Sequence, residues 1–180
     1  MNFVSLKYLV VNFLLILITL MGCNGCKDKK QAAPVTQQQL QQDLIDHNRA
    51  QLQEETKRIE KFIEDKKWPM TETATGLFYW VYEQGMGEVG KNGKDAIVDY
   101  TVSLLDGTQC YKTTPESPTH FLIGQDNVES GLHEVILLMK VGDRARVVLP
   151  SRLAFGVTGD SDKVPQNASV VYDLHLIALR

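Results

Sequence analysis

The stretch VDYTVSLLDGTQCY, residues 98–111, carries the pattern that decides the fold. Apolar and polar residues alternate from Val98 to Leu104, which is typical of a strand with one buried face. Asp106-Gly107 then predicts a tight turn, because glycine readily adopts the positive φ that such turns require. A second short strand over 108–113 completes an antiparallel hairpin.

The same alternation recurs on both sides of this hairpin. It predicts strands over 77–83, 119–123, 143–150 and 169–179, and apolar residues at helical spacing predict one helix over 128–139. We therefore expect an α+β domain over residues 71–180, in which an antiparallel sheet of five or six strands packs on one short helix.

A long helix is predicted ahead of this domain, over residues 36–67. Thr36 and Gln39 fit a capping box, and no Gly or Pro follows until Pro69. The apolar residues form one narrow stripe, which consists of Leu40, Leu44, Ile45, Leu52, Ile59, Phe62 and Ile63. Part of the stripe has the seven-residue spacing of a coiled coil, but Asn48 and Glu55 interrupt the complementary positions. The helix is thus either an arm for homodimerisation or a mostly solvated helix that lies lightly on the domain.

The first 22 residues have the features of a signal peptide. Lys7 precedes an uncharged apolar run of about 14 residues, shorter than the ~20 that span a bilayer. The run ends in Leu-Met-Gly-Cys, which resembles the bacterial lipobox and implies a lipid on Cys23. Residues 23–35 are then a flexible polar tether, and the protein is lipid-anchored in the bacterial cell envelope, facing the periplasm or exterior. The alternative is a signal anchor that stays in the chain as a membrane helix.

Composition and motifs argue against several function classes. The net charge is −3 without a basic stripe, so nucleic acid is not an expected partner. Gly85–Gly90 spells GxGxxG, but no helix is predicted after it, so no nucleotide cofactor is expected. The histidines show no metal-ligand spacing, and no hydrolase motif is present. Cys26 and Cys110 are expected to be unpaired thiols.

Three long motifs, in this order, resemble the FKBP-type peptidyl-prolyl cis-trans isomerases. They are VDYTVSLLDGTQCY at 98–111, FLIGQDNVESGLHEVILLMKVGDRARVVLP at 121–150 and LAFGVTGDSDKVPQNASVVYDLHLI at 153–177. The resemblance runs from about Gly76 to Arg180. It implies a half-barrel sheet wrapped around the short helix, with an apolar cup between them. The order of lipobox, helix and domain is also similar to gliding-motility-associated lipoproteins of Bacteroidota.

The resemblance implies that nine residues surround this cup: Tyr100, Tyr111, Phe121, Val128, Glu129, Leu132, Phe155, Val164 and Tyr172. Four positions depart from the family's pattern. Lys112 stands where the family usually has an aspartate, and Phe155 replaces a tyrosine whose hydroxyl binds the ligand. Leu132 replaces a tryptophan, and Glu129 replaces an isoleucine whose backbone N–H binds the ligand. We expect these changes to weaken binding without removing the apolar pocket.

An apolar cup can be an active site because X-Pro rotation moves no proton. The barrier of about 18–20 kcal/mol arises from lost amide resonance, so a site that removes water and fits the twisted imide lowers it. The resemblance therefore implies a prolyl isomerase that helps exported proteins fold, without a cofactor. The alternative is a catalytically weak binding module that docks an envelope or gliding-machinery partner.

Overall fold

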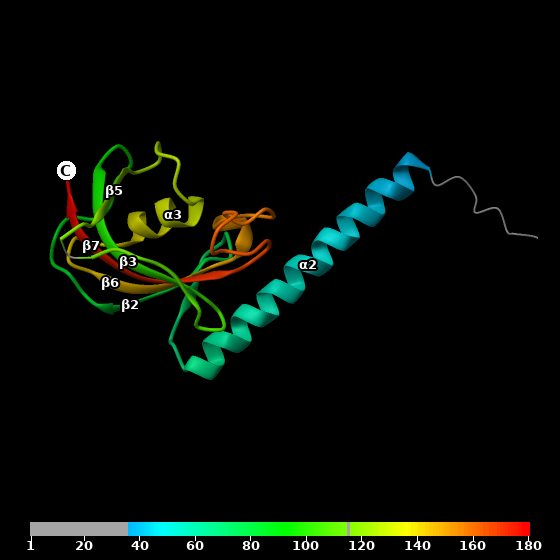
Figure 1. The fold of residues 1–180 in the computed structure, drawn as a ribbon, viewed down its shortest axis with the longest axis horizontal. Coiled ribbons are helices and arrows are strands. Elements are labelled where there is room, and N and C mark those ends of the chain that lie inside the picture. The colour runs from blue at the N-terminus through cyan, green and yellow to red at the C-terminus, as the bar shows by residue number, and fades with distance from the viewer. Residues whose placement is uncertain (1–35, 115) are drawn as a thin grey trace, which may run out of the picture. The chain divides into compact units, whose positions relative to one another are not determined.

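The computed structural model describes residues 36–114 and 116–180, and Figure 1 shows their fold. Residues 45–180 form one compact unit, and the described residues up to Leu44 belong to a separate unit. The predicted signal peptide, the lipidation residue Cys23 and the tether lie outside the described residues.

The predicted long helix is α2, Gln37–Lys66. The predicted capping box is confirmed, because Thr36 N–H donates to Gln39 Oε1 at 3.0 Å and Gln39 N–H donates to Thr36 Oγ1 at 3.3 Å. The helix stops where Lys67 adopts a left-handed φ of 56°, and the N–H groups of Lys67 and Trp68 bond back to carbonyls of the last turn. None of the helices in the described part of the chain is long and apolar enough to cross a membrane.

An antiparallel sheet follows, and it confirms the predicted fold class. The strands are β1 (Thr71–Glu72), β2 (Phe78–Glu83), β3 (Asp95–Leu104), β4 (Gln109–Lys112), β5 (Thr119–Leu122), β6 (Arg144–Leu149) and β7 (Val170–Leu179). Their order is β1-β2-β6-β7-β3-β4, and β5 also pairs with β3. The sheet thus has one strand more than predicted, because the two residues of β1 pair with β2. The expected hairpin is β3-β4, in which Gly107 has a φ of 92°.

One face of the sheet holds the main core. Helix α3 (Ser130–Leu138) lies over this face, as Figure 1 shows, and a short 3-10 helix η1 (Ser151–Leu153) follows β6. The alternating inward residues of the strands pack against Leu132, Val135 and Ile136 of α3. This packing encloses the helix on one side of a curved sheet, and the apolar cluster at the expected cup lies between them.

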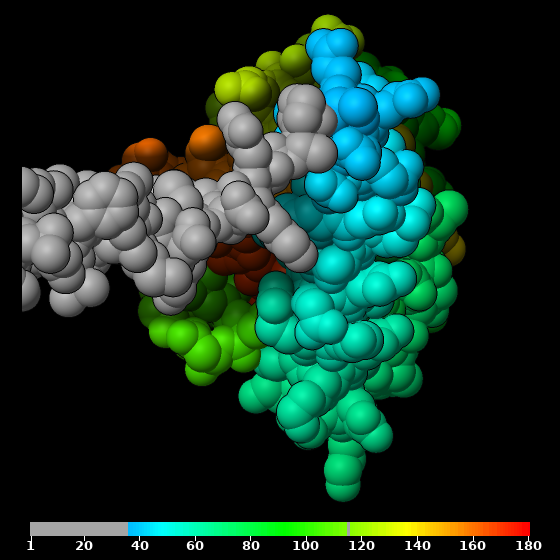
Figure 2. Space-filling view, turned by 90° about the vertical axis from the view of Figure 1, so that its right-hand side faces the viewer, coloured from blue at the N-terminus to red at the C-terminus, as the bar shows by residue number. Residues whose placement is uncertain are grey.

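The other face of the sheet is covered in part by α2. Ile59 is fully buried there, in a second apolar cluster with Phe78, Val148 and Val171. Figure 2 views the helix from outside, with its later turns lying on the domain. Burying one isoleucine contributes about 1.5–3 kcal/mol. Only Glu55 and Ile59 of this helix are buried, so it is mostly solvated, as one of the two interpretations expects, and its later turns are attached to the domain through these two residues.

The glycine-rich segment 85–90 is a loop packed against the end of α3. A Cβ on Gly90 would lie 2.0 Å from the carbonyl oxygen of Ile136, so this position needs glycine for close approach. The buried carboxylate of Asp143 accepts the N–H groups of Gly85 at 2.6 Å and Lys140 at 2.7 Å. The glycines therefore serve loop packing between α3 and β6.

Candidate functional site

The structure brings eight of the nine expected cup residues into one hydrophobic cluster. Phe121, Leu132, Val164 and Tyr172 are buried within it, and Tyr100, Tyr111, Val128 and Phe155 are half-buried against it. They come from strands β3, β4, β5 and β7, from helix α3 with the turn before it, and from the segment after η1. Positions that are up to 72 residues apart in the sequence, from Tyr100 to Tyr172, thus meet at one place.

Strand register explains why the central aromatic rings meet. Val102 of β3 pairs with Tyr172 of β7, so Tyr100 is the diagonal neighbour of Tyr172 on the same face. Their ring centroids lie 5.6 Å apart at 66°, an edge-to-face arrangement. These two rings form a rigid apolar wall beneath the N-terminal end of α3.

The ninth residue, Glu129, is the N-cap of α3. Its backbone is extended, with φ −57° and ψ 135°, and no side chain caps this helix end. The first N–H groups of a helix have no partner inside the helix, and the helix dipole makes this end favourable for an oxygen ligand. The start of α3 can therefore donate a backbone hydrogen bond to a carbonyl group in the cup.

The Glu129 carboxylate lies near the hydroxyl of Tyr172. Burial raises the pKa of the Tyr172 hydroxyl well above its usual value, and the negative charge of the nearby Glu129 carboxylate raises it further. Tyr172 is therefore a neutral donor throughout the physiological range. The family resemblance placed Glu129 at the cup through its backbone N–H and did not predict that its carboxylate lies near Tyr172.

The segment after η1 is tied to the sheet through Asp160. Its carboxylate accepts the hydroxyl of Tyr111 and the backbone N–H groups of Asp162 at 2.9 Å and Val164 at 2.8 Å. Partial burial opposes ionisation, but these hydrogen bonds outweigh it and lower the pKa of Asp160 to about 2. The same bond, with some burial and the charge of Asp160, raises the pKa of Tyr111 to about 12. The Tyr111 hydroxyl thus holds this loop and is already engaged.

Lys112 borders a small polar hollow at the mouth of the cup. The hollow has a volume of about 350 Å³ and is lined by Tyr100, Tyr111, Lys112, Thr113, Thr114, Ser117 and Thr119. The side chain of Lys112 is exposed there. A cation therefore stands where the resembled family usually carries an aspartate.

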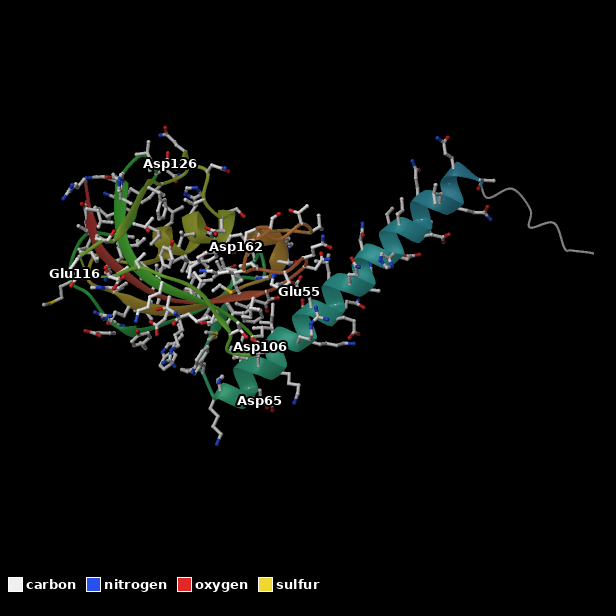
Figure 3. The ribbon with its side chains drawn as sticks, in the orientation of Figure 1. Glu55, Asp65, Asp106, Glu116, Asp126 and Asp162 are labelled. Carbon is white, nitrogen blue, oxygen red and sulfur yellow. The ribbon has the colours of Figure 1, made fainter. Side chains whose placement is uncertain are left out.

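The loop that carries Phe155 and Val164 is supported by α2. Glu55, only 6% exposed, accepts the N–H of Ser151 at 2.6 Å and the hydroxyl of Ser169 at 2.7 Å. Figure 3 shows Glu55 on the side of α2 that faces this loop. One carboxylate oxygen thus holds both ends of the loop, a role that the sequence did not reveal.

Metal binding finds no support in this part of the molecule. Within residues 36–114 and 116–180, no three His, Cys, Asp or Glu side chains are arranged to hold an ion. Cys110 is a buried free thiol, and its pKa is raised, first by burial.

Comparison with known proteins agrees with this geometry. The family model described as FKBP-type peptidyl-prolyl cis-trans isomerase matches residues 87–177. The isomerase FkpA of Escherichia coli K12 is 32% identical over 122 residues, which are 67% of this chain and 43% of that protein. FkpA of Aeromonas hydrophila is 36% identical over 115 residues, 63% of this chain and 42% of that protein. The aligned part of this chain thus spans less than half the length of these relatives.

Solved structures give the same fold. The crystal structure of Escherichia coli FkpA has a TM-score of 0.60 at 25% identity and covers 82% of this chain and 74% of its own. A peptidyl-prolyl cis-trans isomerase from Pseudomonas syringae has a TM-score of 0.61 at 28% identity and covers 73% of this chain and 94% of its own.

Proposed function

We propose that this chain, which belongs to the FKBP-type peptidyl-prolyl cis-trans isomerase family, catalyses cis-trans exchange of X-Pro bonds in exported envelope proteins. The observation that carries this proposal is the cup itself. Buried Phe121 and Leu132 form its floor, the Tyr100–Tyr172 pair forms a wall, and an uncapped helix end lies above them.

The proposed mechanism uses desolvation and fit. The apolar floor removes water from the prolyl imide and so disfavours the planar, resonance-stabilised form, while the aromatic wall accepts the twisted ring. A backbone N–H near Glu129 would hold the carbonyl of a residue next to the proline. No proton is transferred and no bond is broken, so the engaged hydroxyl of Tyr111 does not obstruct the reaction.

We infer reduced activity from two of the departures. Phe155 lacks a hydroxyl, which forgoes one hydrogen bond worth about 1 kcal/mol to a bound ligand. Lys112 adds a cation at the mouth of the cup. Both changes weaken substrate binding and leave the apolar floor in place.

The test is cis-to-trans exchange of a Leu-Pro peptide, followed by NMR with the full chain. Acceleration that falls at least tenfold in Tyr100→Leu supports the isomerase, provided that the variant keeps its circular dichroism spectrum. Exposed Tyr82, changed to Leu, is the matched control and should retain activity. No acceleration by folded protein would refute the proposal.

A second candidate function is a binding module without turnover. Lys112, Glu129 and Phe155 favour it, because each departs from the family's pattern at the cup. This candidate predicts saturable binding of proline-containing peptides, measured by calorimetry, together with unchanged exchange rates.

Location and assembly complete the proposal. We propose that residues 1–22 are a signal peptide, and that a lipid on Cys23 anchors the isomerase domain, residues 71–180, to a membrane of the cell envelope. Labelling with a palmitate analogue should then disappear in Cys23→Ser. The exposed Leu44 and Ile45 of α2 support a homodimer through the helix, which sedimentation of the lipid-free protein tests. A monomer at high micromolar concentration would refute it.

A further inference from the structure

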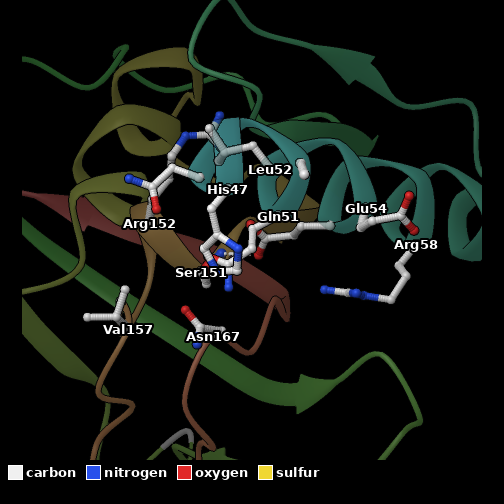
Figure 4. A pocket seen from close by; sticks show the side chains of 13 residues that line it. His47, Gln51, Leu52, Glu54, Arg58, Ser151, Arg152, Val157 and Asn167 are labelled. Atoms are coloured by element: carbon white, nitrogen blue, oxygen red, sulfur yellow. Dashed lines mark hydrogen bonds between the residues drawn. The ribbon is translucent and has the colours of Figure 1, made fainter. Parts of the chain in front are cut away.

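A second hollow lies beside the cup, between α2 and the loop that follows η1 (Figure 4). Its volume is about 560 Å³, within the range of small-molecule and peptide pockets. One side is a face of α2, and the other is formed by Ser151, Arg152, Gly156, Val157 and Asn167. This hollow is called the helix groove below.

The helix groove offers polar groups that suit a peptide backbone. Within the described residues, the side chains of His47, Asn48, Gln51 and Asn167 make no hydrogen bond or ion pair. Side-chain amides both donate and accept, so they match the alternating N–H and C=O groups of an extended chain. Figure 4 shows Gln51 on the helix and Asn167 on the loop, on opposite sides of the groove.

The groove also offers apolar contacts and little net charge. Val157 is 72% exposed and Leu52 is 43% exposed, and both line it. The lining holds two carboxylates, Glu54 and Glu55, and two guanidinium groups, Arg58 and Arg152, so neither sign of charge dominates. This combination suits a polypeptide of mixed sequence better than a phosphate-bearing ligand, which needs concentrated positive charge.

The groove and the cup share one loop of the chain. Gly156 and Val157 follow Phe155 directly, and consecutive Cα atoms lie 3.8 Å apart. Gly156 N–H donates to the carbonyl of Ser151 at 2.8 Å, and Asn167 N–H donates to the carbonyl of Gly156 at 3.2 Å. These bonds fix one loop as the shared wall of both sites.

We propose that the helix groove binds an extended segment of the same polypeptide whose proline occupies the cup. This inference rests on the proposed isomerase function. It assigns to α2 a direct role in holding long clients, and a peptide of four residues, which spans at most about 14 Å, serves as the short substrate for comparison.

The test compares a Leu-Pro tetrapeptide with an unfolded protein whose refolding is limited by X-Pro isomerisation. The double variant Asn48→Ala/Gln51→Ala in the full chain should raise KM for the unfolded protein at least about fivefold, the lower limit for the loss of two hydrogen bonds. It should leave kcat/KM for the tetrapeptide within twofold. Gln53→Ala, an exposed position of the same helix outside the groove, is the matched control and should change neither value. A parallel loss on both substrates, or no loss on either, would overturn the groove as a client site.

A second measurement separates this inference from the proposed function. A photo-crosslinking residue at position 51 should capture the unfolded protein, and the same residue at position 53 should not. If the folded chain does not accelerate exchange of the tetrapeptide, the isomerase proposal fails. The crosslink alone then shows whether the helix groove binds the unfolded protein. No capture at position 51, or capture of a second copy or of the chain's own residues 1–35, overturns the inference.

Discussion

Removal of the Glu55 carboxylate should destabilise the protein far more than a typical helix-surface substitution. In Glu55→Ala, the buried N–H of Ser151 loses its acceptor, which costs about 1–3 kcal/mol. The hydroxyl of Ser169 loses a charge-assisted bond, worth about 1.5 kcal/mol. We therefore expect a loss of about 3 kcal/mol in the free energy of unfolding. Glu55→Gln keeps an acceptor at the same place and should lose only about 1 kcal/mol.

Urea denaturation of the full chain measures this loss, because a shift of midpoint at constant slope reports a change in stability. The control is Glu54→Ala, at the next position and exposed, which should stay within about 0.5 kcal/mol of the parent. In a double-mutant cycle, Ser169→Ala should cost much less when Glu55 is already alanine. The reasoning fails if Glu55→Ala and Glu54→Ala have the same effect, or if the cycle is additive.

Three further predictions concern the cup and its loop. Phe155→Tyr with Lys112→Asp should raise turnover of a Leu-Pro peptide about tenfold, a gain near 1.4 kcal/mol measured by NMR exchange; an unchanged rate would mean that these residues do not limit activity. Asp160→Asn should return the pKa of Tyr111 from about 12 toward 10, measured by ¹³C NMR of labelled tyrosine. A Tyr111 pKa that stays at about 12 in this variant would exclude Asp160 as the cause of the shift. In the parent protein, the stability contributed by ionised Asp160 is present above pH ~3.9 and is lost as pH falls toward 2. The stability contributed by protonated Tyr111 is present below pH ~10 and is lost as pH rises toward 12. Gly131→Ala should lower stability by about 1–3 kcal/mol in thermal melts, because its Cβ would lie 2.5 Å from a core methyl group; a melting temperature equal to that of the parent would contradict this packing.

Local patterns predicted the elements well because their causes are local. The turn at Asp106-Gly107 depends on two adjacent residues, and the capping box at Thr36 depends on a residue three positions away. The strand over 98–104 follows from alternation along its own length. The sequence therefore predicted the hairpin, both helices and the fold class from short-range rules.

Long-range pairs were out of reach for the opposite reason. Glu55 meets partners 96 and 114 positions later, and Tyr111 meets a partner 49 positions later. Nothing in the neighbourhood of either residue distinguishes it from a solvated glutamate or an ordinary core tyrosine. The residues of the cup were found only through the family resemblance, because on alternation alone Tyr100 and Tyr172 are ordinary core positions.

The docking of α2 did leave a signal in the strands. A strand in a sheet with one solvated face should have apolar residues only at every second position. Here Leu77 and Val147 belong to the main core, and the next residues, Phe78 and Val148, are also apolar and belong to the cluster on the other face. Such two-sided apolar positions need a second layer, and Ile59 supplies it. The same helix then carries Glu55 to the loop of Phe155, so the segment that covers the outer face also fixes the wall of the cup. For this reason we regard residues 45–66 of α2 as part of the site's support and not merely as a spacer.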